Sequence, residues 1–234
     1  MRVLAIGAHP DDIEIACSGT LAKCVKRGDK VIVCHASTGN LGHVVIPPDE
    51  LTKIRAEEAR KAGSLAGIEV IGGMFDDLDI YADNKAARDK IVEVIKYAQP
   101  DFIITHAPDD YMPDHTAVSK LVFDASFTAT LPNYRVGGAK PAKLVPIYYM
   151  DTLAGVDFNP TEFVDITDEI DLKIRMLECH ASQLVWMREH DGIDFADMVH
   201  TCSKYRGYQC GAAYAEGFRQ CRVYLKGTTK RLLP

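Results

Sequence analysis

The stretch VLAIGA, residues 3–8, is a short apolar run of the kind that forms a parallel strand buried on both faces of a sheet. Residues 19–26 follow as a predicted helix, which ends at Gly28 because glycine is favoured directly after a helix. Residues 30–36, KVIVCHA, are a second apolar run and predict a second strand. A strand, a helix and a strand in this order indicate a right-handed crossover between parallel strands.

The same alternation continues along the chain. Further strands are predicted at 68–71, 101–107, 147–152 and 163–167, and further helices at 51–65, 86–98, 114–129 and 168–184. Residues 130–146 are rich in Gly, Pro and Lys and are expected to form a surface loop. Residues 186–212 are the least regular stretch and are expected to be a flexible lid or an oligomer contact. The pattern predicts one α/β domain over residues 1–234, with a Rossmann-like, mostly parallel sheet and helices on both faces.

The composition excludes several classes of protein. Of the 234 residues, 47% are hydrophobic and 26% are charged, which are ordinary values for a globular chain. The formal net charge is −6 and no basic patch stands out, so no nucleic-acid partner is expected. No apolar run reaches the roughly 18 residues of a membrane span, and the N-terminus does not read as a signal peptide. The seven cysteines contain no C-x-x-C pair, which favours free thiols and a cytoplasmic location.

Polar side chains follow the first and the fourth predicted strands. His9, Asp11 and Asp12 come directly after the first strand, and Asp114 and His115 lie in the loop that follows the fourth. The carboxyl ends of parallel strands lie at one edge of a sheet, where ligands bind. If the two strands are close together, these side chains are therefore expected to converge on one crevice.

The residue types in the two loops suit a divalent metal ion such as Zn²⁺. A catalytic zinc site needs three protein ligands and an open position, and His9, Asp12 and His115 are the expected ligands. Asp11 would then act as general base toward the attacking water. Asp114 would either cap the following helix or steer a histidine through a hydrogen bond. The alternative is a solvated turn that merely caps a helix.

Several motifs resemble those of one family. Residues 8–14, AHPDDIE, followed by SGTL at 18–21, resemble the opening motif of the LmbE-like family, the PIG-L type zinc-dependent N-acetylglucosaminyl deacetylases. The stretch MPDH at 112–115 resembles the second metal motif of that family, and YAEGF at 214–218 resembles a motif near its end. The similarity extends over almost the whole chain.

The resemblance implies a Rossmann-like fold and hydrolysis of the acetamide of an N-acetyl sugar or a related small molecule. It assigns zinc to the same three ligands, the general base to Asp11, and contacts with sugar hydroxyls to Arg55 and Asp76. It also implies a homo-oligomer, such as a hexamer, whose subunit contacts help to shape the active site.

The sequence departs from the family pattern at two positions. Met112 stands where the second motif usually carries a histidine, three residues before His115. The missing imidazole would help to stabilise the oxyanion or protonate the leaving amine, and loss of such a group typically costs about a hundredfold or more in rate. Lys143 is at the position of the family's basic substrate-binding residue. It keeps the positive charge but lacks the planar, two-pronged guanidinium of arginine.

Other side chains are candidates to replace the missing imidazole. We hypothesise that His200 supplies it from the irregular C-terminal stretch, either of the same chain or of a neighbouring subunit, with His106 and His190 as alternatives. Tyr111 could donate a hydrogen bond to an oxyanion or pack on its loop. Trp186 could stack on a sugar ring or serve as a packing residue.

The sequence therefore predicts zinc-dependent hydrolysis of an N-acetylglucosamine-type substrate to acetate and a free amine. Two alternatives remain open. One is an amidase that cleaves another acyl amide or a thiol-sugar conjugate, and the other is a metal-binding family member without catalysis. The chain contains no G-x-S-x-G, no P-loop and no G-x-G-x-x-G after the first strand, which argues against a serine hydrolase of that type, a P-loop NTPase and a dinucleotide enzyme.

Overall fold

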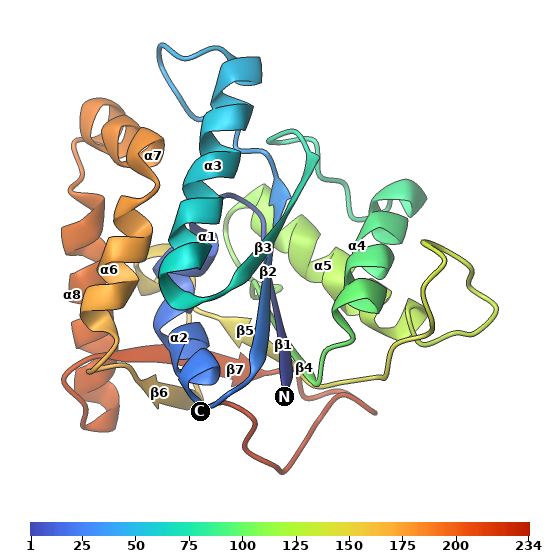
Figure 1. The fold of residues 1–234 in the computed structure, drawn as a ribbon. Helices are drawn as coiled ribbons and strands as arrows, with labels where there is room; N and C mark the ends of the chain where they lie inside the picture. The colour runs from blue at the N-terminus through green and yellow to red at the C-terminus, as the bar shows by residue number, and fades with distance from the viewer.

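The computed structural model describes all 234 residues and contains one seven-stranded sheet in the order β3-β2-β1-β4-β5-β7-β6 (Figure 1). The strands are β1 (Arg2–Gly7), β2 (Lys30–Ser37), β3 (Glu69–Phe75), β4 (Phe102–Thr105), β5 (Ile147–Met150), β6 (Glu162–Asp165) and β7 (Ala215–Gln220). The helices are α1 (Asp12–Ala16), α2 (Ser18–Lys26), α3 (Pro48–Ala66), α4 (Lys85–Ala98), α5 (Pro113–Thr128), α6 (Ile170–Glu178), α7 (Ala181–Trp186) and α8 (Phe195–Cys210).

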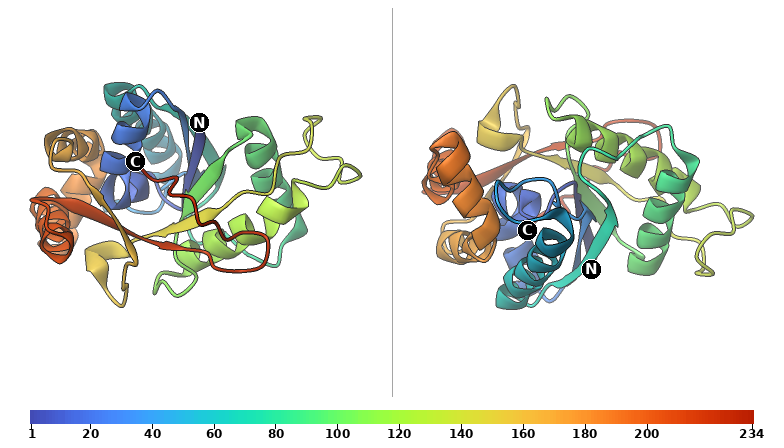
Figure 2. Two further views of the ribbon diagram at one scale, coloured as in Figure 1. Left: turned by 90° about the horizontal axis from the view of Figure 1, so that it is seen from below. Right: turned by 90° about the horizontal axis from the view of Figure 1, so that it is seen from above.

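The first five strands are parallel, and β7 runs antiparallel to both β5 and β6. Figure 2 shows α4 and α5 on one face of the sheet and α1, α2 and α3 on the other. The predicted α/β class, with a mostly parallel sheet and helices on both faces, is confirmed. The strand order reverses direction between β1 and β4, and ligands of such sheets bind in the crevice at that point.

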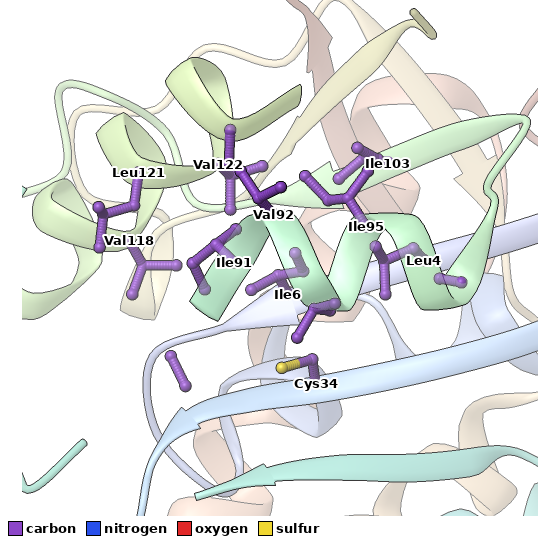
Figure 3. Packing of buried hydrophobic residues seen from close by; sticks show 14 of the residues in the cluster. Leu4, Ile6, Cys34, Ile91, Val92, Ile95, Ile103, Val118, Leu121 and Val122 are labelled. Carbon is purple, nitrogen blue, oxygen red and sulfur yellow. The ribbon is translucent and has the colours of Figure 1, made fainter. Parts of the chain in front are cut away.

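Side chains alternate along β1 and so contribute to two hydrophobic cores. Leu4 and Ile6 pack with the apolar faces of α4 and α5, among them Ile91 and Leu121 (Figure 3). The intervening residues of β1 point to the opposite face and pack against α1, α2, α3 and α6. This period of two explains why β1 reads as an uninterrupted apolar run.

Two sequence predictions in the C-terminal part of the chain are wrong. The helix predicted at 168–184 is two helices, α6 and α7, separated at the buried His180. The stretch predicted to be irregular contains the 16-residue helix α8. Asp194 caps this helix by accepting a hydrogen bond from the backbone amide of Asp197, and Gly211 ends it with a φ of 79°. An N-terminal cap and a terminal glycine indicate the two ends of a helix. The residues between them have only a weak apolar periodicity, so the sequence did not predict α8.

Other expectations hold. Residues 131–146 form a mostly irregular surface loop between α5 and β5. All seven cysteines are free thiols. No helix in the structure is both long enough and apolar enough to cross a membrane.

Candidate metal centre and catalytic cavity

His9, Asp12 and His115 come together at the carboxyl edge of the sheet, at the reversal point between β1 and β4. Each offers a ligand atom that lies within 4.8 Å of the other two. The Nε2 atom of His115 lies 3.2 Å from Asp12 Oδ1, and His9 Nδ1 lies 3.5 Å from Asp12 Oδ2. The turn after β1 is held by Asp12 itself, whose Oδ2 accepts the backbone amide of His9 at 2.6 Å.

A carboxylate orients each of the two imidazoles. Asp114 Oδ2 lies 3.1 Å from His9 Nε2, and Asp110 Oδ2 lies 3.0 Å from His115 Nδ1. In both rings the other nitrogen is left facing Asp12. This is the arrangement that usually accompanies metal-binding histidines, because the carboxylate fixes the ring and strengthens it as a ligand.

Asp110 lies in the turn before α5 and supports the candidate metal centre. Its carboxylate is buried, and besides contacting His115 it accepts the backbone amide of Met112 at 3.0 Å. Asp109, its neighbour, is exposed and pairs with Arg219. In the sequence the two aspartates are indistinguishable, because only the direction of the turn before α5 separates them.

The residues present fit a divalent metal ion. His115 Nε2 is buried and has no hydrogen-bond partner, although Asp12 lies close by. Burial alone lowers the pKa of His115, but the charge of Asp12 and the hydrogen bond to Asp110 outweigh it and raise the pKa to about 9. A buried imidazole nitrogen without a partner, beside a carboxylate oxygen, is a donor set suited to Zn²⁺.

Asp11, between the candidate ligands His9 and Asp12 in the chain, has a strained backbone conformation. Its φ is 132°, a value that costs a residue other than glycine about 1–3 kcal/mol. The side chain is buried, and burial together with repulsion from Asp12 raises the pKa of Asp11 to about 7. A carboxylate that titrates near neutral pH can accept a proton during turnover.

The site opens into a cavity of about 360 Å³. Its polar lining near the site includes the three candidate ligands with Asp11, Arg55 and Asp77. Apolar side chains line it from α1, α7, α8 and the segments beside them: Ile15, Ala16, Leu153, Trp186, Met187 and Phe195. The same C-terminal segments also contribute Asp151, Gln183 and Asp191, so a substrate of this cavity would carry both polar and apolar groups.

Arg55 projects from α3 into the cavity and is almost fully buried, with 3% of its surface exposed. Its Nη2 donates to the carbonyl of Gly42 at 2.8 Å and to Gln183 Oε1. Gly39 has a φ of 70°, and a Cβ there would lie 2.5 Å from Arg55 Nη1. A glycine is needed at this position both for the backbone conformation and for the approach of the guanidinium.

Of the other predicted binding residues, Tyr111 lines the cavity, whereas Asp76 and Lys143 do not. Tyr111 lines the cavity and is 56% exposed at its mouth. Asp76 is exposed and accepts a hydrogen bond from Asn40 at 3.0 Å, whereas its neighbour Asp77 lines the cavity. Lys143 is exposed in the loop that precedes β5, at the amino end of the parallel strands. Because the site is at the carboxyl end, Lys143 does not reach it within one chain.

The three histidines that are candidates to replace the missing imidazole lie in different places. His200 lies half-buried on α8 against Tyr214, with ring centroids 4.8 Å apart, and does not line the cavity of this chain. His190 is exposed and stacks on Trp186 at 4.2 Å. His106 does line the cavity and stacks on His115 with a centroid separation of 3.8 Å.

His106 is held as a neutral ring. Its Nε2 accepts the backbone amide of Ala8 at 2.9 Å and lies 3.1 Å from Asp12 Oδ2. Burial and the neighbouring His115 lower the pKa of His106 to about 4. Because Nε2 accepts, the proton of the neutral ring is on Nδ1.

Comparison with known proteins identifies the family. Residues 4–126 match the family PIG-L, GlcNAc-PI de-N-acetylase, over more than half of the chain. The chain belongs to this family. It is 28% identical over 233 residues to a diacetylchitobiose deacetylase from Thermococcus kodakarensis, covering 93% of this chain and 82% of that protein. It is also 26% identical over 190 residues to a 4-oxalmesaconate hydratase from Pseudomonas putida, covering 77% and 73% of the two chains.

Solved structures show the same fold. A 4-carboxy-2-hydroxymuconate hydratase from Pseudomonas putida superposes with a TM-score of 0.82 at 22% identity, covering 99% of this chain and 100% of that one. An N,N'-diacetylchitobiose deacetylase from Pyrococcus horikoshii superposes with a TM-score of 0.79 at 24% identity, covering 93% and 82%. Relatives of this family thus include both deacetylases and a hydratase, so membership alone does not select the reaction.

Proposed function

We propose that this chain is a zinc-dependent N-deacetylase that hydrolyses the acetamide of an N-acetylglucosamine-type substrate. The observation that carries the proposal is that Asp11, the chain neighbour of Asp12, lines the same cavity as the three candidate ligands. The likeness to a diacetylchitobiose deacetylase over 93% of the chain supports the substrate class.

His9, Asp12 and His115 would hold the metal ion, with Asp114 and Asp110 fixing the two imidazoles. When bound there, zinc polarises a carbonyl and lowers the pKa of water. Asp11 accepts the proton of the attacking water on a carboxylate oxygen and holds it close to the departing amine.

The remaining polar groups of the cavity position the substrate. The guanidinium of Arg55 points hydrogen-bond donors at sugar hydroxyls, and the carboxylate of Asp77 accepts from them. The ring of Trp186, which lines the same cavity, packs on the apolar face of the sugar. His200 enters only in an oligomer, because within one chain it lies outside the cavity.

A second candidate function is hydration of a carbon–carbon double bond in an unsaturated carboxylic acid. Met112 lines the cavity at the position where the resembling motif carries a histidine, and a thioether cannot donate a proton. Amide hydrolysis must protonate a departing amine. Addition of water places the hydroxyl on one carbon of the double bond and a proton on the other, and Asp11 would return the proton taken from water to that carbon. Arg55 is a buried cation without a carboxylate partner and would bind a substrate carboxylate, which fits the hydratases among the relatives.

The test measures acetate release from a panel of N-acetylated amino sugars by the zinc-loaded protein. The matched control is His115→Ala, checked for folding by circular dichroism. Acetate release that is lost in the control supports the proposal. A parallel assay follows loss of ultraviolet absorbance of 4-oxalmesaconate: consumption of this acid without acetate release would replace the first function by the second. Inactivity of metal-loaded protein in both assays would contradict both functions and favour a metal-binding role.

A further inference from the structure

Two buried charged residues of α3 contact the first turn of α7, which lies beside α3 (Figure 1). Arg55 and Glu58 are three residues apart on the buried face of α3, with 3% and 8% of their surfaces exposed. Residues at this spacing are neighbours on a helix, and opposite charges there commonly pair. These two instead form hydrogen bonds with consecutive residues of α7, Ser182 and Gln183.

The carboxylate of Glu58 uses both of its oxygens to hold Ser182. Oε1 accepts the backbone amide of Ser182 at 2.9 Å, and Oε2 accepts its hydroxyl at 2.7 Å. The amide is one of those that a helix leaves without an internal partner at its start. Both hydrogen bonds are buried, so water does not readily replace the carboxylate if it is removed.

Gln183 connects this contact to the catalytic cavity. Its Oε1 accepts a hydrogen bond from Arg55 Nη2, whose other partner is the carbonyl of Gly42. Both Gln183 and Arg55 line the cavity, and so does Trp186 one turn further along α7. The placement of α7 therefore bears on the direction of the guanidinium and on the position of the indole ring.

The short helix α7 has few other anchors. Of its six residues, only Ser182 is buried. Leu184 and Trp186 are partly buried against a cluster of four apolar residues. A helix of this length has little stability of its own, so its position depends on the contacts that it makes with its neighbours.

We propose that Glu58 is a positioning residue of the catalytic cavity. By holding Ser182 it fixes the start of α7, and thereby the places of Gln183 and Trp186 and the direction of the Arg55 guanidinium. Glu58 does not line the cavity and acts only through these neighbours. The inference rests on the proposed function in that a sugar occupies the cavity, but the position of α7 can be measured without turnover.

The first measurement is the fluorescence of Trp186, which is the only tryptophan of the chain. In the zinc-loaded protein, Glu58→Ala should shift the emission to longer wavelength and increase quenching by acrylamide, because α7 loses its anchor. Ser182→Ala removes only the hydroxyl and should cause a smaller change in the same direction, which keeps the test open if Glu58→Ala does not fold.

Two variants serve as controls. Glu57→Ala changes the neighbouring residue of α3, which is exposed and pairs with Arg60, and should leave the fluorescence unchanged. Glu58→Gln can still accept the backbone amide of Ser182 and can donate to its hydroxyl, so it should restore the fluorescence of the wild type. Circular dichroism checks that each variant is folded.

The second measurement follows acetate release from N-acetylglucosamine. Glu58→Ala should raise KM about tenfold, the effect of losing one hydrogen bond to a charged donor. Its kcat should stay within about twofold of the wild type, because binding is weakened equally in the ground state and the transition state. The zinc content should not change.

Three results would overturn the proposal. They are wild-type fluorescence in Glu58→Ala, a Glu58→Gln variant that behaves like Glu58→Ala, and a fall in kcat at constant KM, which would assign Glu58 to the chemistry. A wild type that hydrolyses no N-acetyl sugar would contradict the proposed function instead, and the fluorescence of Trp186 would still decide the role of Glu58.

Discussion

The side chains around Asp12 show how much of the site depends on single residues. Asp11 and Asp12 are adjacent, both are buried, and they have opposite pKa shifts. Burial raises the pKa of Asp12, but the three surrounding imidazoles outweigh it and lower that pKa well below its usual value. The positive charges near Asp11 do not offset its burial. Burial and the charge of Asp12 therefore raise the pKa of Asp11 to about 7. Neighbouring carboxylates with separated pKa values suit the separate roles of ligand and base.

The first prediction at this scale concerns the general base. Asp11→Asn should reduce kcat by about 100-fold or more, because the amide cannot accept the proton of water. Asparagine has nearly the same shape as aspartate, so the turn should be retained. Zinc content, measured by atomic absorption, should stay at the wild-type level. A kcat close to that of the wild type would remove Asp11 from the reaction.

The second prediction concerns Asp110, which orients His115. Asp110→Asn should weaken zinc binding by about 10- to 100-fold, because the imidazole loses the carboxylate that fixes its orientation. The measurement is competition with a chromophoric chelator. Asp109→Asn is the matched control, since this neighbour is exposed and contacts Arg219 instead. Equal zinc affinity in the two variants would show that Asp110 does not support the metal centre.

At the scale of elements, a buried carboxylate of β7 joins the C-terminal strand to the first helices. Glu216 Oε2 accepts the backbone amide of Thr20 at 2.7 Å, and its Oε1 accepts the amide of Gly19 at 3.0 Å. The same carboxylate pairs with the buried Lys173 of α6 at 2.7 Å. One side chain thus links β7, α2 and α6, three elements that are distant in the sequence.

We predict that Glu216→Gln lowers the free energy of unfolding by about 3 kcal/mol, because Lys173 is left buried without a counter-charge. The measurement is equilibrium urea unfolding followed by circular dichroism. Glu178→Gln makes the same change at an exposed position of α6 and should alter the free energy by no more than about 0.5 kcal/mol. Similar values for both variants would show that the buried pair does not stabilise the fold.

At the scale of the whole molecule, the candidate ligands come from both sides of the point where the strand order reverses. His9 and Asp12 follow β1, and His115 follows β4. A bound ion would therefore connect two crossover units of the sheet. Because such a ligand set is assembled only in the folded chain, metal binding and folding are coupled.

This coupling gives a prediction for metal removal. Zinc at about 100 times its Kd should add about 2.7 kcal/mol to the free energy of unfolding, which corresponds to roughly 5–10 °C in Tm for a chain of this size. Treatment with EDTA followed by dialysis should reverse the gain in a thermal unfolding experiment. His115→Ala should show no response to zinc, and a response equal to that of the wild type would place the ion elsewhere.

Much of this protein could be predicted from the sequence because its signals are local. The apolar run of β1 and the alternation of strands with helices determine a parallel sheet. The position of His9 and His115 after two such strands places both at one edge. The convergence of His9, Asp12 and His115 follows from these local patterns together with the rule that parallel strands end at the same edge.

Only the tertiary structure decided which neighbours join the site. Asp110 is used and Asp109 is not, and Asp77 lines the cavity where Asp76 was expected. Part of the apolar lining comes from α7 and α8, far along the chain from β1, and α8 was not predicted at all. The physical reason is that strands and helices arise from the short-range periodicity of the chain. The direction of a side chain in a turn, and the elements that close a cavity, depend instead on long-range packing that no local pattern records.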